Sequence, residues 1–142
     1  VSHKYPDQAE NAARIAARLK ELTAELRFET DAPMHKDFHY GHIVVNGWLK
    51  VIDFDEMCAA PAALDFSSYV AHLVNGDLDD MDAAASALGG LVEGYGSRPR
   101  GASWYVATSI LRRSPFPFRF MQPQWPRSIE RMVSAAEEAL HV

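Results

Sequence analysis

Apolar residues recur at intervals of three or four positions near the start of the chain. These positions are Ala12, Ile15, Ala16, Leu19, Leu22 and Leu26. Such a spacing places the side chains on one face of a helix, so it predicts an amphipathic helix that begins near Pro6 and Asp7. The proline-containing run at residues 30–33 ends this pattern, and residues 34–40 are expected to be extended or looped.

Two runs of β-branched, aromatic and other apolar residues follow at positions 43–45 and 48–54. They are separated by Asn46 and Gly47, two residues that tolerate positive φ. An Asn-Gly pair between such runs is the strongest local signal for a β-hairpin. The sequence therefore predicts a hairpin whose second strand runs to Phe54, with Asp53 closing it.

Helical patterns dominate the rest of the chain. Helices are predicted at residues 62–73, 79–92, 102–113 and 127–140, the last opened by Pro126 in the first turn, where proline is tolerated. Two prolines, Pro115 and Pro117, are expected to interrupt helical structure between the last two helices. We expect a single domain, residues 1–142, of the α+β class, mostly helical around a central β-hairpin.

Charge and composition narrow the class of protein. The formal net charge is −5, whereas non-specific binding to nucleic acid or to an acidic membrane needs a basic surface. No apolar run approaches the roughly 20 residues that span a bilayer, and the N-terminal residues contain no apolar signal-peptide core. The single cysteine, Cys58, fits a reducing compartment and is expected to be a core thiol. We therefore expect a cytoplasmic protein that binds neither nucleic acid nor membrane.

Histidines and carboxylates gather around the predicted hairpin. His35, Asp37 and His42 precede it, and Asp53 and Asp55 follow it. Protein kinases place a catalytic aspartate ahead of a metal-binding asparagine, and a second metal-binding aspartate after the next hairpin. Asp37, His42 and Asp53 have this arrangement. If the carboxylates converge, they repel one another unless a cation lies among them.

Three segments carry a resemblance to a known family. They are "HKDFHYGHIVV", "VIDFDE" and "PAALDFSSYVAHL", all within residues 34–73. They are similar to the signature of the aminoglycoside phosphotransferase and choline kinase family: His-Gly-Asp-x-x-x-x-Asn, a hairpin, Ile-Asp-Phe/Trp-Asp/Glu, and a Pro-Ala-x-Asp stretch that opens a helix. The resemblance implies a protein-kinase-like C-terminal lobe that transfers a phosphoryl group from ATP, with Mg²⁺, to a hydroxyl group of a small molecule.

The resemblance also implies roles for individual residues. Asp37 would accept or orient the proton of the acceptor hydroxyl. Asp53 would hold the divalent ion, and His42 stands at the place of the family's metal-binding asparagine. Three residues would support the loop: His35, Asp55 and Asp65, with Asp65 bracing it by hydrogen bonds. The acceptor and the nucleotide-binding residues are left open by these motifs.

The chain departs from the family pattern in three ways. First, His42 stands where the family has asparagine. Mg²⁺ prefers oxygen ligands, whereas imidazole suits Zn²⁺, Mn²⁺ or Ni²⁺, so His42 would ligate a softer ion or would hydrogen-bond Asp37 without touching a metal. Lys36 replaces the family's glycine. A kinase also needs a glycine-rich loop and a lysine on an N-terminal lobe, and only one helix is predicted ahead of Met34. We therefore expect the N-terminal lobe to be absent, and the chain to be a weak or inactive enzyme that is either a fragment or a natural truncation.

Other interpretations stay open. A degenerate lobe would serve as a non-enzymatic binding module, or would form a homo-oligomer through the face left by the missing lobe. His35, His39 and His42 would offer a metal site without kinase chemistry, whereas His72 is expected to be a core histidine.

Two further segments are enriched in residues of one kind. Arginines and aromatic residues between positions 112 and 125 hint at base stacking and phosphate contact, although a packed loop near the acceptor pocket fits them better. The acidic run at residues 77–82 would attract a cationic substrate or, more simply, cap a helix.

Overall fold

Helices make up most of the computed structural model, which describes residues 6–26, 32–77 and 81–141. The described helices are α1 (Pro6–Leu22), α2 (Ala63–His72), α3 (Met81–Tyr95), α4 (Ala102–Arg113), α5 (Phe116–Arg119) and α6 (Trp125–Ala139). Short 3-10 turns lie at Thr23–Glu25 (η1) and Tyr40–His42 (η2), and α2 continues into a π-helical turn at Leu73–Asp77 (η3). None of the helices in this part of the chain has both the length and the apolar character that a bilayer-spanning segment needs.

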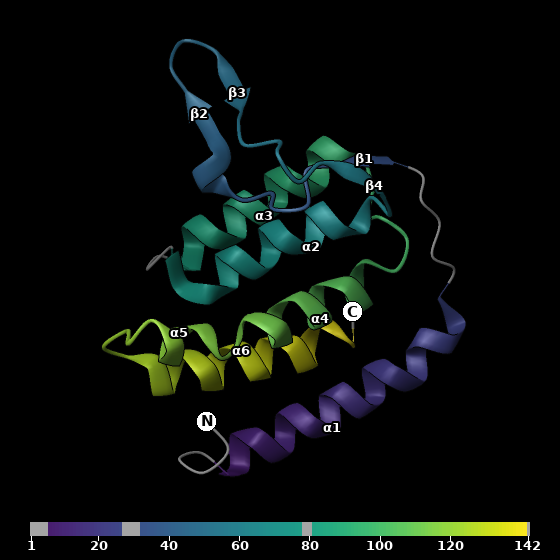
Figure 1. Cartoon of the computed structure of the whole chain (residues 1–142), viewed down its shortest axis with the longest axis vertical. Helices are drawn as coiled ribbons and strands as arrows, with labels where there is room; N and C mark the ends of the chain where they lie inside the picture. Colours follow the sequence, from purple (N-terminus) through teal and green to yellow (C-terminus); the bar gives the residue numbers. More distant parts are fainter. Residues whose placement is uncertain (1–5, 27–31, 78–80, 142) are drawn as a thin grey trace.

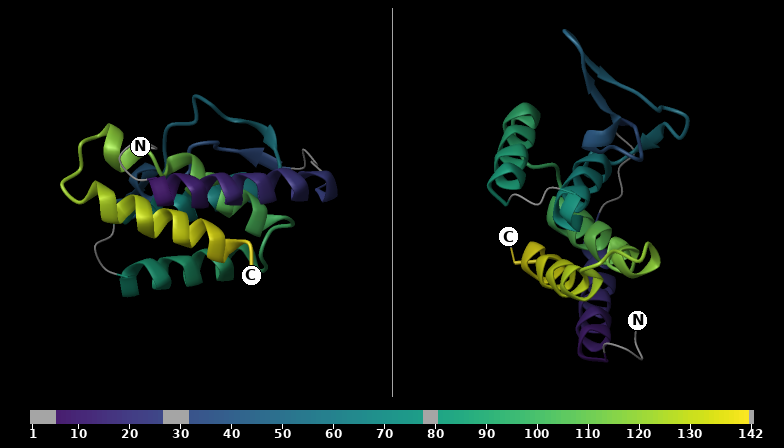
Figure 2. Two further views of the ribbon diagram at one scale, coloured as in Figure 1. Left: turned by 90° about the horizontal axis from the view of Figure 1, so that it is seen from below. Right: turned by 90° about the vertical axis from the view of Figure 1, so that its left-hand side faces the viewer.

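The helices stack in layers. Helix α2 packs against α4, α4 packs against α6, and α1 lies against both α4 and α6. Figure 1 shows this order from top to bottom, with α1 at the end of the molecule opposite the β2–β3 hairpin, and the right-hand view of Figure 2 shows it from the side. One buried cluster joins α2, α4 and α6 through Phe66, Val70, Ala71, Ala102, Val106, Ile110, Met132 and Ala136. A second joins α1, α4 and α6 through Ile15, Leu19, Ala107, Ile129 and Val133.

Two small antiparallel sheets lie next to α2. Strands β2 (Ile43–Val45) and β3 (Leu49–Val51) form the predicted hairpin, and Gly47 in its turn has a φ of 68°. Strand β3 ends at Val51, so the prediction that Asp53 closes the strand was wrong. Asp53 lies in the loop beyond the strand with a φ of 68°, a value that a regular strand does not allow.

The second sheet was not predicted. Strand β1 (Ala32–Met34) pairs with β4 (Cys58–Ala60), so that Met34 lies opposite Cys58. Cys58 is exposed on this short strand, and the expectation of a core thiol was therefore wrong. The pairing matters because it brings the loop after β1 next to the loop before β4.

Most predicted helices form close to their expected positions, and α4 matches residues 102–113. Residues 79 and 80 of the predicted third helix lie outside the described residues. The expected break at Pro115 and Pro117 was wrong in part, because α5 forms there. Pro115 and Pro117 stand at the start of this helix, where the missing N–H would have no helical partner.

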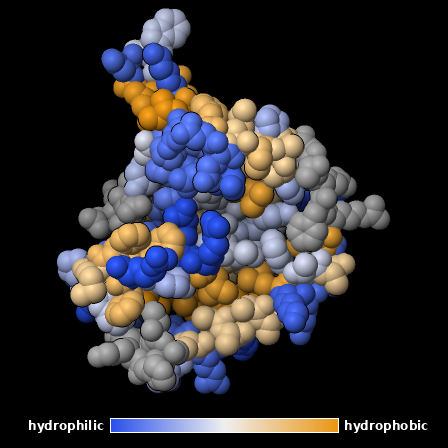
Figure 3. All heavy atoms as spheres, viewed as in Figure 1, coloured by the Kyte–Doolittle hydropathy of each residue, from blue (hydrophilic) through white to orange (hydrophobic). Residues whose placement is uncertain are grey.

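The β2–β3 hairpin extends away from the helices. Its side chains Val45, Trp48 and Leu49 are exposed, Trp48 to 78%. The loop that follows also exposes Ile52 and Phe54. Figure 3 shows apolar side chains along the stem of this projection. This part of the chain thus presents apolar surface that the described helices do not cover.

Candidate functional site

The loop after β1 and the loop after β3 meet above α2, and Asp65 fixes the first of them. Asp65 lies in the first turn of α2 and is 8% exposed. Its Oδ2 accepts a hydrogen bond from the backbone N–H of His35 at 2.8 Å, and its Oδ1 accepts one from Lys36 at 2.8 Å. Hydrogen bonds to an ionised acceptor are about twice as strong as neutral ones. A single carboxylate therefore ties the loop to the helix.

The negative charge of this carboxylate also affects the pKa of Tyr95 on α3. Partial burial raises the pKa of the Tyr95 phenol, and the negative charge of Asp65 raises it further. A negative charge near a phenol disfavours the phenolate, which accounts for the second contribution.

His35 joins the two loops. Its Nε2 lies 2.7 Å from the carbonyl oxygen of Ile52, and because a carbonyl only accepts, Nε2 carries the hydrogen. The ring is buried and stacks at a tilt on Phe54, with 4.9 Å between ring centres. This histidine thus holds the residue next to Asp53 against the loop that carries Asp37.

Lys36 occupies the glycine position of the family signature and adopts a glycine-like backbone, with a φ of 75°. A residue with a Cβ in the left-handed region costs roughly 1–2 kcal/mol. Its ammonium group forms an exposed ion pair with Glu56 at 3.1 Å. The backbone geometry of the loop therefore explains why glycine would suit this position.

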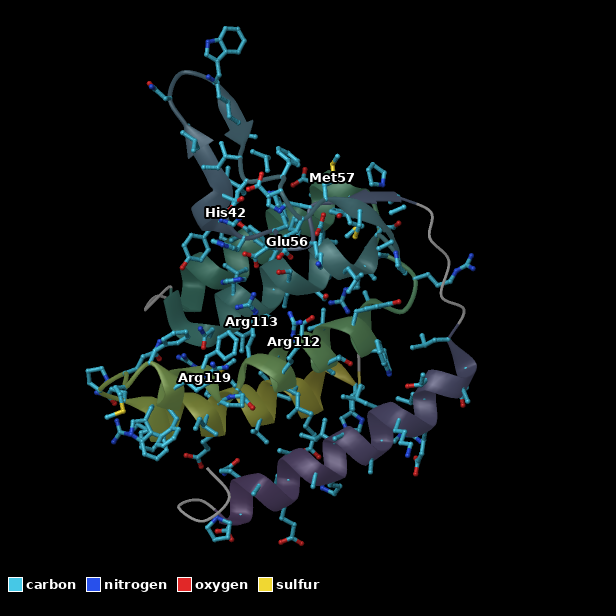
Figure 4. All side chains as sticks on the ribbon, viewed as in Figure 1. His42, Glu56, Met57, Arg112, Arg113 and Arg119 are labelled. Atoms are coloured by element: carbon cyan, nitrogen blue, oxygen red, sulfur yellow. The ribbon has the colours of Figure 1, made fainter. Side chains whose placement is uncertain are left out.

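Asp37 presents its carboxylate to a ring of nitrogen atoms, although the side chain is 53% exposed. Arg113 Nη2, from the end of α4, lies 3.5 Å from Oδ1 and donates a hydrogen bond to it. His72 Nε2 lies 3.9 Å from the same oxygen, and His39 Nε2 lies 3.9 Å from Oδ2. Figure 4 shows Arg113 on α4, below the loop that carries His42.

His42 connects Asp37 to Asp53. Its Nδ1 donates to the backbone carbonyl of Asp37 at 2.9 Å, and its Nε2 lies 3.3 Å from Asp53 Oδ2. Since Nδ1 carries a hydrogen, the Nε2 of a neutral imidazole turns its lone pair toward the carboxylate. This contact becomes favourable when Nε2 is protonated or when a cation lies between the two groups. Ligating histidines commonly donate their other ring N–H to a backbone carbonyl, as His42 does.

Four imidazole rings form a column above α2. The ring centres of His35 and His42 are 5.3 Å apart, those of His42 and His39 are 3.9 Å apart, and those of His39 and His72 are 4.2 Å apart. His72 was expected to be a core histidine; its side chain is 13% exposed and thus largely buried, and its Nε2 lies 3.9 Å from Asp37 Oδ1.

The structure disfavours a metal site that uses several of these histidines, the alternative that the sequence left open. In the described part of the chain, the metal-capable side chains that converge as a trio are Asp37, His39 and His72, with ligand atoms within 4.8 Å of one another. However, His39 Nδ1 accepts the backbone N–H of Gly41 at 3.0 Å, so a neutral His39 carries its hydrogen on Nε2. The nitrogen that faces Asp37 is then a donor and not a metal ligand. Gly41 permits this contact, because a Cβ there would lie 2.7 Å from His39 Cε1.

The remaining predicted residues are placed as follows. Asp55 lies exposed in the turn before β4, and within the described part of the chain its side chain makes no hydrogen bond or ion pair. The acidic run at residues 77–82 lies outside the described side chains. The structure thus brings Asp37, His42, Asp53, His35 and Asp65 together, whereas Asp55 stands apart.

Sequence reasoning did not foresee that His72 and Arg113 approach Asp37. His72 follows Asp65 by seven residues, which is about two helical turns and puts both on one face of α2, so a signal for it existed. Arg113 lies 76 positions from Asp37, and no local spacing connects the two.

A helix-rich chain with one hairpin flanked by Asp37 and Asp53 is consistent with part of a kinase-like fold. Residues 1–105 match the model of the phosphotransferase enzyme family, APH. The chain belongs to this family, and the resemblance found in the hairpin region is confirmed. Searches of curated proteins and of solved structures returned no match.

Proposed function

We propose that the protein transfers a phosphoryl group from ATP to a hydroxyl group of a small molecule. Membership of the phosphotransferase family supports the class of reaction. The observation that carries the proposal is the connection between Asp37 and Asp53 through His42, whose two nitrogens contact the backbone of one and the carboxylate of the other. The proposed base and the proposed cation-binding pair are thereby connected by direct contacts.

Asp37 would act on the acceptor. Its Oδ1 is engaged by Arg113, which leaves Oδ2 to accept the proton of the hydroxyl group. As the oxygen of the acceptor hydroxyl forms its bond to phosphorus, the bond between phosphorus and the ADP oxygen breaks, and the hydroxyl proton passes to Asp37.

His42 and Asp53 would hold a divalent ion. One imidazole nitrogen with an available lone pair and one carboxylate oxygen, 3.3 Å apart, form a suitable donor pair. The family implies Mg²⁺ as the ion, and imidazole favours Mn²⁺ over it. When bound, the ion neutralises charge on the phosphates. Asp65 and His35 would position the loop that carries Asp37, through the hydrogen bonds described above.

The described helices and hairpin would correspond to the C-terminal lobe of a kinase-like fold. The exposed apolar side chains of Val45, Trp48 and Leu49 support a contact with further structure on that side. Kinases hold ATP between this lobe and a second lobe with a glycine-rich loop and a lysine. A cytoplasmic location, where ATP is available, would suit this activity.

The test is ADP formation by the chain with ATP and either Mg²⁺ or Mn²⁺, over a panel of hydroxyl acceptors. Asp37→Asn should lower turnover by about 10²–10⁴-fold, the usual contribution of a positioned base. Asp7→Asn, at an exposed aspartate in the first turn of α1, is the matched control and should leave turnover unchanged. His42→Asn should shift the ion preference from Mn²⁺ toward Mg²⁺. Full turnover by Asp37→Asn, or no nucleotide binding by the wild-type chain, would refute the proposal.

A second candidate function is a non-enzymatic module that associates through the hairpin. The exposure of Trp48 and Leu49 on a projecting hairpin favours it. Sedimentation would then show a dimer, and the double variant Trp48→Ser, Leu49→Ser would be a monomer. A wild-type monomer that binds ATP would exclude this candidate.

A further inference from the structure

The segment that forms α4 and α5 has a composition unlike the rest of the chain. Residues 94–129 contain six arginines, no lysine and no acidic residue, so all 19 Asp and Glu residues lie elsewhere. The whole chain has a formal charge of −5, which makes the segment a strong local reversal of sign. The guanidinium group presents a planar fork of donors that matches carboxylate and phosphate. Such a segment favours a compact anion over a polycation.

One of these arginines contacts the candidate base, and a second packs on the same phenylalanine ring as the first. The guanidinium of Arg113, which donates to Asp37, is centred 5.6 Å from the ring centre of Phe116. The guanidinium of Arg119 is centred 5.8 Å from the same ring. Phe116 therefore contacts both Arg119 and the arginine that holds Asp37. Figure 4 labels both, together with Arg112, on α4 and α5.

The two arginines differ in their access to solvent. The side chain of Arg113 is 10% exposed and is engaged by Asp37. Arg119 and Arg112 are exposed. Arg119 is therefore open to a ligand from solvent, whereas Arg113 is held against Asp37.

The histidine next to Asp37 adds a donor in the same place. Because His39 Nδ1 accepts from Gly41, its Nε2–H points toward Asp37 Oδ2. Arg113 and His39 thus both direct donors at this carboxylate. A cationic acceptor would find Asp37 as its attractive partner and the arginines as repulsive neighbours.

We infer that the acceptor is a small hydroxyl compound that also carries a carboxylate or phosphate group, bound mainly by Arg119. This inference rests on the phosphotransferase function proposed above and names its substrate class. The acceptor hydroxyl would lie at Asp37 and the anionic group at Arg119. Aminoglycosides and choline, which are cationic, would be poor acceptors.

The first test needs no turnover. Isothermal titration of the full chain, without nucleotide, compares malonate and inorganic phosphate with choline. The wild-type chain should bind the two anions more tightly than choline. Arg119→Gln should weaken malonate binding by about tenfold, since bonds to charged groups contribute most to such contacts. Arg18→Gln, an exposed arginine on α1, is the matched control and should leave binding unchanged.

The second test uses turnover with a matched pair of acceptors, glycerate and glycerol. The value of kcat/KM should be at least about tenfold higher for glycerate, and Arg119→Gln should raise KM for glycerate alone. Tighter binding of choline than of malonate, or unchanged malonate binding in Arg119→Gln, would overturn the inference. Equal turnover of glycerol and glycerate would also overturn it while leaving the phosphotransferase function intact. A lack of ADP formation with every acceptor would count against that function, and the malonate titration still decides whether Arg119 binds anions.

Discussion

Replacing Asp65 with asparagine should release the loop that carries Asp37. The carboxamide has nearly the shape of the carboxylate, but it has one oxygen to accept a hydrogen bond where the native side chain uses two. Either His35 or Lys36 would then lose its acceptor and face an NH₂ group. The other hydrogen bond, at 2.8 Å in the native protein, would persist without its charge.

The magnitude follows from these two bonds. A buried N–H left without an acceptor costs about 1–3 kcal/mol, and loss of charge from the second bond costs about 1 kcal/mol more. Asp65→Asn should therefore lower the free energy of unfolding by about 2–4 kcal/mol. This is a large share of the roughly 5–15 kcal/mol that stabilises an ordinary domain.

Urea unfolding followed by circular dichroism measures the change. With a slope of about 1–3 kcal/mol per molar urea, the midpoint should fall by about 1 M or more at an unchanged slope. Hydrogen exchange should accelerate at the amides of His35 and Lys36. Asp55→Asn removes a carboxylate from the exposed turn nearby and should change stability by less than about 0.5 kcal/mol. If Asp65→Asn is as stable as this control, or if the two amides keep their protection, the role of Asp65 as an anchor is refuted.

Three further changes test other parts of the structure. Lys36→Ala and Lys36→Gly both remove the exposed ion pair with Glu56, but alanine keeps the energetic cost of a positive φ. Thermal unfolding should therefore show that the glycine variant is more stable by about 1 kcal/mol. Equal stability of the two variants would contradict the positive φ of this residue. Ile110→Ala should lower stability by about 2–5 kcal/mol in urea, because the side chain is 1% exposed in the core. The hydrogen bond from Arg14, at 2.7 Å, lowers the pKa of Glu137. Its contribution to stability should thus be present at neutral pH and be lost as the pH falls through the lowered pKa. The difference between wild type and Glu137→Gln should shrink on acidification, and a difference that grows would show that the sign is wrong.

The parts of the fold with strong local signals could be predicted from the sequence. Asn46 and Gly47 fix the hairpin because few residue pairs adopt the backbone of its turn. The helices follow from apolar residues repeated at helical spacing, which explains why α4 was placed accurately. The β1–β4 pair was missed because strands of three residues, with alanine and proline in place of β-branched residues, have no such signal.

The residues of the site were likewise predictable where they had a local signal and unpredictable where they had none. His35, Asp37, His42, Asp53 and Asp65 lie within one stretch of sequence, and the family signature orders them. The roles assigned to them stay predictions until the variants above are measured. Arg113 could not be found, because its contact with Asp37 depends on how α4 packs against α2, and that packing is set by apolar side chains with no motif of their own.

The contact between Arg113 and Asp37 has an evolutionary consequence. The α4–α5 segment, which would select the acceptor through Arg119, also helps through Arg113 to orient the group that would activate it. Substitutions in the α4–α5 segment that improve the fit to a new compound would therefore disturb Asp37 as well. A lineage that changes its preferred compound should carry compensating changes at both ends of this contact, so the two positions should covary among descendants of a common ancestor.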